Sequence, residues 1–152
     1  MALFVMACSQ DKHAGTRPAG LKYNARQHRA LFHEFFVEQA YCSHDALILS
    51  AEFGFLPLSR PIPDYDLILD DVRAAEIVFD DAQVRVIASA LAEMEDQTVY
   101  VYGGKRYRDA VRAILSRMGF LGQVVDVVGP NRGCCDHFAA LQGLFRAQSV
   151  DA

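Results

Sequence analysis

Short apolar runs alternate along the chain with longer amphipathic stretches, and this pattern predicts the fold. Runs of strand length occur at residues 2–7, 46–50, 98–102 and 123–128, and the first is continuously hydrophobic, as in a buried parallel strand. Apolar residues at helical spacing predict helices over about residues 26–42, 80–95, 107–118 and 134–148. Strands that alternate with helices predict an α/β fold: an open, three-layer Rossmann-like sheet, mainly parallel, of about four strands with helices on both faces.

The segment 54–66 interrupts this alternation. It contains Pro57, Pro61 and Pro63, and proline is unfavourable both in a helix interior and in a central strand. We therefore expect a long ordered loop. Apolar side chains in this loop would otherwise form an exposed patch, so we expect Phe55 or Leu56 to be buried and the loop to pack over one edge of the sheet.

Length and composition favour one soluble domain spanning residues 1–152. The chain is 52% hydrophobic and 22% charged, with a formal net charge of -4. This acidic balance argues against bulk capture of nucleic acid, although lysines and arginines gather near the ends of the first and third strands and can make that edge locally positive. Four cysteines without paired spacing, and the absence of a leader pattern, favour a reducing cytoplasmic compartment. No apolar stretch approaches the ~20 residues of a membrane helix.

Polar residues follow three of the predicted strands directly, and this suggests a single site. The carboxyl ends of parallel strands share one edge of the sheet, where ligands bind. We therefore expect Ser9, Ser50 and Gly103 to lie together on that edge. In the first segment, Cys8 to Lys12, backbone N–H groups and the Lys12 ammonium can bind an anion. Alternatively, Cys8 is a small buried hydrophobe and Lys12 a solvated charge.

The second segment places a hydroxyl and a carboxylate at a strand end. Ser50 and Glu52 precede Gly54, which suits a turn with positive φ. Glu52 lies between Ala51 and Phe53, and a partly apolar setting would raise the pKa of its carboxyl group and suit it to acid–base work. The alternative is that Glu52 pairs with a nearby lysine or arginine.

The proline segment ends in two further carboxylates, Asp64 and Asp66, on either side of Tyr65. They could hold ribose hydroxyls, a divalent ion or a water molecule. Loop aspartates often bond their own backbone, so Asp64 is the candidate turn former, whereas Asp66 and Tyr65 are the candidate site residues. We expect Asp66 to lie near Glu52 or Lys12.

The third segment combines glycines, cations and aromatic residues. Gly103 and Gly104 permit close approach of a ligand to the backbone, and the helix that follows has an N-terminus favourable for phosphate. Tyr102, Tyr107 and Arg108 suit a base or nucleotide through stacking and charge-assisted hydrogen bonds.

Cysteine and histidine residues do not form a convincing metal site. The candidates have unsuitable spacing, because adjacent cysteines rarely point at one metal, so we expect neither a metal nor another cofactor; they are Cys42, His44, Cys134, Cys135 and His137.

Four short motifs occur in an order that resembles a known group of small bacterial and phage domains. They are Cys8-Ser9 with Lys12, Leu49 to Gly54, Pro63 to Asp66, and Tyr107-Arg108. The chain is similar to the YaaA peroxide-stress proteins and to the uracil-DNA-glycosylase-like domain of archaeosine-synthesis enzymes. This resemblance implies an α/β fold and a link to nucleic acids or modified bases. The chain lacks the DNA-binding hairpin of the longer YaaA proteins and the water-activating motif of uracil glycosylases.

These features lead to one functional hypothesis and two alternatives. The hypothesis is a cytoplasmic enzyme, of the hydrolase or glycosidase class, that acts on a nucleotide, nucleoside or modified nucleobase by cleaving or exchanging an N-glycosidic bond. Its catalytic residues would be Glu52, Asp66 and Ser9, and its ligand-binding residues would be Cys8, Lys12, Ser50, Gly54, Tyr65, Tyr102, Gly103, Tyr107 and Arg108. The first alternative is a non-catalytic module of a base-modification or stress-response system, either one that binds DNA or RNA or an accessory subunit of its enzyme. The second is a stress protein with a reactive Cys8 thiol.

Overall fold

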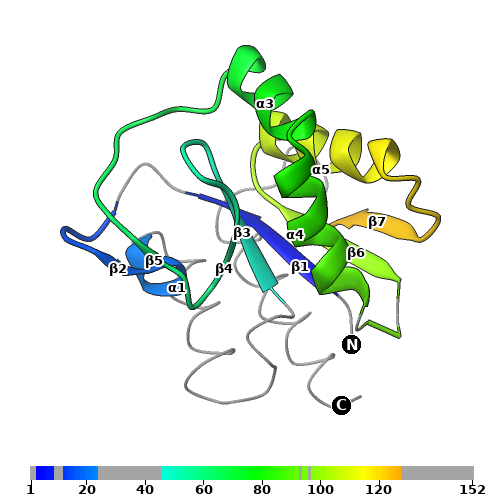
Figure 1. The fold of residues 1–152 in the computed structure, drawn as a ribbon, viewed down its shortest axis with the longest axis horizontal. Helices are drawn as coiled ribbons and strands as arrows, with labels where there is room; N and C mark the ends of the chain where they lie inside the picture. Colours follow the sequence, from blue (N-terminus) through cyan, green and yellow to red (C-terminus); the bar gives the residue numbers. More distant parts are fainter. Residues whose placement is uncertain (1–2, 9–11, 24–45, 93, 96, 128–152) are drawn as a thin grey trace.

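In the described part of the chain, the main sheet has five strands and is mostly parallel (Figure 1). The structure is a computed structural model that describes residues 3–8, 12–23, 46–92, 94–95 and 97–127. The strand order is β4-β3-β1-β6-β7, and every neighbouring pair is parallel except β3 and β4. The strands are β1 (Leu3–Ala7), β3 (Ala46–Ser50), β4 (Gly54–Pro57), β6 (Thr98–Tyr102) and β7 (Gln123–Asp126). The expected α/β class and the four expected strands are therefore confirmed, within a mixed sheet of five strands.

The central position of β1 brings distant segments together. Val5 lies opposite Leu47 of β3 on one side and Val101 of β6 on the other. Beyond the end of β1, the backbone N–H of Cys8 donates to the carbonyl of Leu49 at 3.0 Å. The carboxyl ends of β3, β1, β6 and β7 therefore share one side of the sheet, which we call the C-terminal edge.

The prediction of a loop throughout residues 54–66 is wrong. Residues 54–57 form β4, an edge strand antiparallel to β3, and β5 (Pro61–Ile62) pairs with β2 (Arg17–Pro18). Proline is excluded from central strands, but Pro57 ends an edge strand, where a missing N–H is tolerated. Phe55 and Leu56 are buried, as expected.

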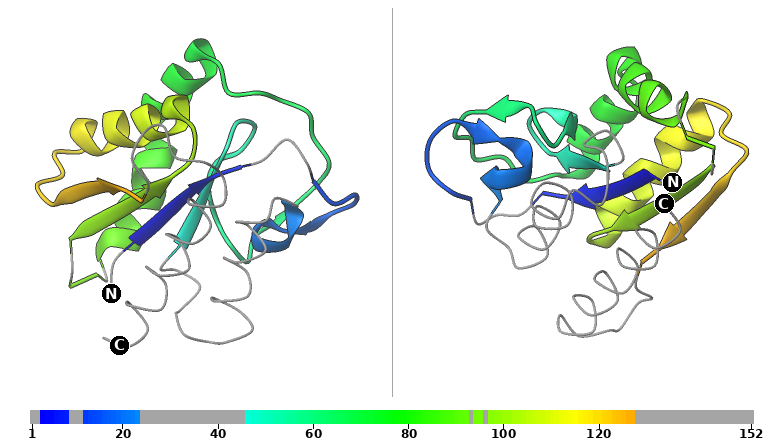
Figure 2. Two further views of the ribbon diagram at one scale, coloured as in Figure 1. Left: turned by 180° about the vertical axis from the view of Figure 1, so that it is seen from behind. Right: turned by 90° about the horizontal axis from the view of Figure 1, so that it is seen from below.

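Helices pack on one face of the sheet, as Figures 1 and 2 show for α3 (Asp71–Val78), α4 (Asp81–Ala92) and α5 (Lys105–Arg117). α4 and α5 match expected helices, whereas α3 was not predicted. α3 begins after Asp70, whose carboxylate accepts a hydrogen bond from the backbone N–H of Arg73 at 2.7 Å. The core on this face contains Val5 and Val101 of the sheet and Ile114 of α5.

The opposite face of the sheet is also buried. Phe4 and Ile48 pack there with Leu56, Ile62 and Tyr23, which follows the short helix α1 (Ala19–Lys22). Successive strand residues point to opposite faces, which is why every residue of β1 and β3 is buried. The helices expected over about residues 26–42 and 134–148 lie outside the described residues.

Candidate functional site at the C-terminal edge of the sheet

Ser50, the last residue of β3, is completely buried and is held by three hydrogen bonds. Its Oγ accepts from the backbone N–H groups of Glu52 and Phe53, each at 3.2 Å, and donates to the hydroxyl of Tyr65 at 3.0 Å. Gly54 completes this turn with a φ of +75°. The serine side chain thus shapes the turn between β3 and β4 and directs its own proton toward Tyr65.

Tyr65 is the centre of the site. Its hydroxyl lies 2.6 Å from the hydroxyl of Tyr23, in addition to its bond with Ser50. The Lys12 ammonium lies 4.6 Å from the centroid of the Tyr65 ring, and the Phe53 ring meets it edge-on at 5.3 Å. We call Tyr23, Ser50 and Tyr65 the hydroxyl cluster. It combines hydrogen-bonding groups with a cation and aromatic surface.

A second pair lies where β1 meets α5. The thiol of Cys8 is 3.3 Å from the hydroxyl of Tyr107, in the first turn of α5. Gly103 between β6 and α5 has a φ of +149°, and a Cβ there would lie 2.5 Å from the Cβ of Ala7. Glycine is thus required for the close approach that brings α5 to the end of β1.

Burial disfavours ionisation of these phenols, which are already protonated at neutral pH. It raises the pKa of Tyr23 to about 12. Burial is also the largest cause that raises the pKa values of Tyr65 and Tyr107, and the nearby Cys8 thiol adds to both effects. At neutral pH all three side chains are therefore neutral O–H groups that can donate hydrogen bonds.

The candidate carboxylates do not enter the hydroxyl cluster. The side chains of Glu52 and Asp66 are exposed, so the partly apolar setting expected for Glu52 is not found. In the described part of the chain, neither carboxylate forms an ion pair. Asp64 instead accepts hydrogen bonds from the buried ammonium of Lys22 at 2.5 Å and from the backbone N–H of Gly15 at 2.9 Å.

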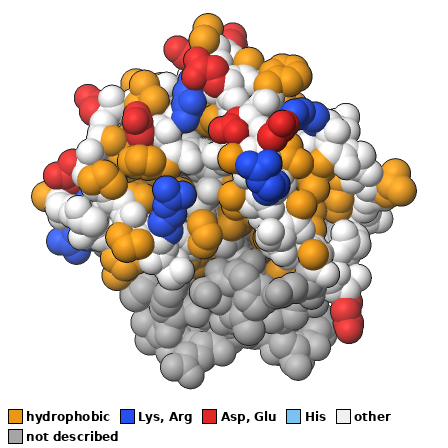
Figure 3. Space-filling view, in the orientation of Figure 1, with side chains coloured by type: hydrophobic (Ala, Val, Ile, Leu, Met, Phe, Trp, Pro, Cys, Tyr) orange, Lys and Arg blue, Asp and Glu red, His pale blue; other side chains and the backbone are white. Residues whose placement is uncertain are grey.

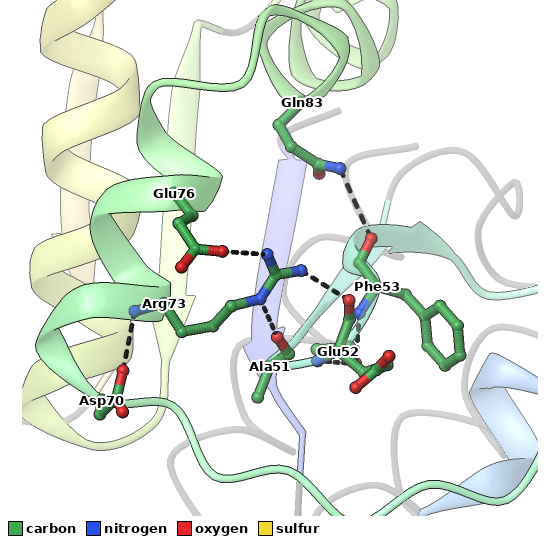
Figure 4. A network of polar contacts seen from close by, with 8 residues as sticks. Ala51, Glu52, Phe53, Asp70, Arg73, Glu76 and Gln83 are labelled. Carbon is green, nitrogen blue, oxygen red and sulfur yellow. Dashed lines mark hydrogen bonds and ion pairs between the residues drawn. The ribbon is translucent and has the colours of Figure 1, made fainter.

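Two helical side chains hold the turn that carries Ser50 and Phe53 (Figure 4). Arg73 of α3 donates to the carbonyls of Ala51 and Glu52, both at 2.6 Å, and pairs with Glu76 at 3.2 Å. The second is Gln83 of α4. Its Oε1 accepts from the N–H of Phe55 at 2.7 Å, and its Nε2 donates to the carbonyl of Phe53 at 3.5 Å. Side chains of α3 and α4 therefore fix the backbone of the turn between β3 and β4.

Cations near the C-terminal edge are largely neutralised by acids. Asp126, at the end of β7, pairs with Arg108 at 3.1 Å and with Arg112 at 2.7 Å. Lys105 and Arg106 pair with Asp109 and Asp71, respectively. Figure 3 shows Lys and Arg side chains beside Asp and Glu side chains on the face of Figure 1. Arg108 thus contacts a carboxylate rather than standing as a free anion-binding group, although its buried Nε has no hydrogen-bond partner in the described part of the chain.

The remaining candidates are only partly placed. Tyr102 ends β6 half-buried against the core opposite α5. Ser9 lies outside the described residues, as do Cys42, His44, Cys134, Cys135 and His137. Among the residues that the structure describes, no cluster of three His, Cys, Asp or Glu side chains could hold a metal ion. Within the same residues, no helix is long and apolar enough to cross a membrane.

Sequence reasoning missed three contributors to the site. Tyr23 carried no local signal, because it follows a helix of only four residues, α1, and its partner Tyr65 is 42 residues away. Arg73 and Gln83 belong to amphipathic helices, where polar residues ordinarily face water. Arg73 and Gln83 hold the backbone of the turn between β3 and β4 only because their helices pack beside it.

The fold and the site define an α/β protein with a hydroxyl-lined site at the edge of its sheet. The chain belongs to a family of unknown function, DUF6884, whose model matches residues 3–124. This stretch includes the hydroxyl cluster and the Cys8–Tyr107 pair. A search of curated proteins found no match.

Proposed function

We propose that this protein is an enzyme that acts on a nucleotide, nucleoside or modified nucleobase, and that it cleaves or exchanges an N-glycosidic bond. The observation that carries the proposal is the hydroxyl cluster, in which Tyr65 is bonded to Ser50 and Tyr23 and lies beneath the Lys12 ammonium. Aromatic rings at this site, Phe53 and Tyr65, offer surfaces on which a base can stack.

The side chains of this site suit the cleavage of an N-glycosidic bond. When the bond between C1′ and the base nitrogen breaks, its electron pair leaves with the base, and positive charge develops on the sugar. Tyr65 and Tyr107, whose pKa values burial raises further, can donate hydrogen bonds to the departing base, and Lys12 can stabilise its negative charge. A water molecule or an incoming base then bonds to C1′, and an exposed carboxylate, Glu52 or Asp66, accepts its proton.

The pairing of cations with aspartates near the C-terminal edge favours a small ligand over a nucleic-acid polymer. A non-catalytic nucleic-acid-binding module would present a broad cationic surface, because phosphate contacts dominate such binding. In the described residues around the edge, Lys105, Arg106 and Arg108 are each paired with an aspartate. This pairing supports the enzyme over the binding module.

The test combines a ligand screen with one matched pair of variants. Nucleosides, nucleotides and modified bases are screened by thermal shift, and products are analysed by chromatography. Tyr65→Phe should lower kcat/KM about 10- to 100-fold, the effect of losing one strong hydrogen bond of roughly 1.5 to 3 kcal/mol. Tyr100→Phe is the control, because Tyr100 stacks on Phe4 instead of joining the hydroxyl cluster. If no compound is turned over while short DNA or RNA binds and is recovered unchanged, the binding module replaces the enzyme.

Three further expectations belong to this proposal. A three-layer Rossmann-like arrangement is supported by the burial of Phe4, Ala46 and Ile48 on the face opposite α4 and α5. A relationship to the YaaA proteins and to the uracil-DNA-glycosylase-like domains is supported by the order of the four motifs. Two of their residues, Ser50 and Tyr65, are in direct contact. A reducing, cytoplasmic location is supported by the free thiol of Cys8 in the site.

A further inference from the structure

Two adjacent pairs of side chains join residues 22–23 to residues 64–65, at the end of the proline segment. Lys22 bonds to Asp64, and the next residues in each segment, Tyr23 and Tyr65, bond to each other. The Lys22 side chain is completely buried, and its Nζ also donates to the carbonyl of Gly15 at 2.5 Å. One carboxylate oxygen of Asp64 therefore receives both the Lys22 ammonium and the Gly15 N–H.

Backbone pairing alone does not fix the position of Tyr65. The two segments are tied by the β2–β5 pair and by hydrogen bonds from Ala19 to Arg60 and from Gly20 to Leu58. This ladder ends at Ile62. Among the described residues, no backbone-to-backbone hydrogen bond holds residues 63–68, which have no regular secondary structure. Side-chain contacts must hold Tyr65 in the site.

We propose that Lys22 and Asp64 are positioning residues that hold the Tyr65 hydroxyl against Ser50 and Tyr23. The inference rests on the proposed function only in treating Tyr65 as a site residue. The ion pair fixes residue 64 beside residue 22, so the following residues, 65 and 23, meet with their hydroxyls 2.6 Å apart. A buried ammonium without its carboxylate is strongly unfavourable, so loss of Asp64 forces Lys22 to move and releases this contact.

The experiment measures the accessibility of Tyr65 without any ligand. Purified full-length protein is treated with N-acetylimidazole at neutral pH, and acetylation of each tyrosine hydroxyl is followed by peptide mass spectrometry. In Asp64→Ala, the rate at Tyr65 should rise at least about tenfold relative to Tyr100, the internal reference. Asp64→Asn should restore part of the protection, because its amide oxygen can still accept hydrogen bonds from Lys22 and Gly15, although the negative charge beside the Lys22 ammonium is lost.

A matched control separates positioning from general loosening. Asp81→Ala also removes an exposed carboxylate that pairs across elements, with Arg117, and it should leave the Tyr65 rate unchanged. Circular dichroism verifies that each variant is folded under the conditions of labelling. Unchanged protection of Tyr65 in Asp64→Ala would overturn the proposal, and so would an equal rise at Tyr65 in Asp81→Ala. Because no substrate is used, failure of the enzyme proposal leaves this result interpretable.

Discussion

Replacing Ser50 by alanine tests whether the hydroxyl cluster stabilises the fold. The change removes one oxygen and opens little space, so its cost comes from hydrogen bonds. Three are lost: the Oγ accepts from the N–H groups of Glu52 and Phe53 and donates to Tyr65. Glu52 is exposed, so water can replace one partner. The other two groups are half-buried, and at ~1 to 2 kcal/mol each, Ser50→Ala should cost about 2 to 4 kcal/mol.

Urea unfolding followed by circular dichroism measures this loss, and thermal unfolding provides a second measurement. For a chain of this length the melting temperature should fall by roughly 5 to 15 °C. The control is Ser89→Ala, an exposed position in α4 where alanine is the better helix former, so stability should not fall.

A double-mutant cycle with Tyr65→Phe isolates the bond between the two hydroxyls. The coupling between Ser50→Ala and Tyr65→Phe should be about 1 kcal/mol, because each variant alone leaves the other hydroxyl without this partner. A loss below about 0.5 kcal/mol for Ser50→Ala, or additive effects in the cycle, would refute the reasoning.

Two further predictions concern stability. Gly103→Ala should lose at least about 2 kcal/mol of stability, because the new Cβ would meet Ala7 at 2.5 Å with a φ of +149°. Gly104→Ala has nothing within 4 Å of the new Cβ and should lose less than about 1 kcal/mol, because it changes only the N-cap of α5. Urea unfolding of both variants compares them. The hydrogen bond from Lys22 lowers the pKa of Asp64 in the folded protein. The contribution of this ion pair to the free energy of unfolding is therefore present above the ordinary pKa near 3.8 and is lost as the pH falls through the lowered value. Between pH 5 and about 2, wild type should therefore lose more stability than Asp64→Ala, and parallel unfolding curves for the two proteins would contradict this assignment.

The periodicity of the chain alone determined the class of fold. Strands at residues 46–50 and 98–102 were expected and found, because short apolar runs bounded by polar residues are a local signal. Their alternation with helices placed Ser50 and Gly103 at the ends of strands that run parallel, flanking β1.

Whether residues 54–57 form a strand depended on the position of β4 in the sheet. Pro57 excludes a central strand, and the sequence does not say whether a strand lies at an edge. That depends on how many partners the strand has, and within the residues that the structure describes β4 has one, β3. The same limit applies to α3, where tertiary packing rather than a long apolar pattern stabilises eight residues.

Which polar side chains meet was decided by the tertiary structure. The sequence singled out Tyr65 and Ser50, but Tyr23 and Lys22 join the site through contacts with residues 42 positions away. Exposure of Glu52 likewise follows from the turn that Ser50 builds. Local pattern determined β1, β3, β6 and β7 and the helices α4 and α5, because it reflects the repeat of the backbone. Side-chain partners depend on how the elements pack, and that packing is a property of the whole chain.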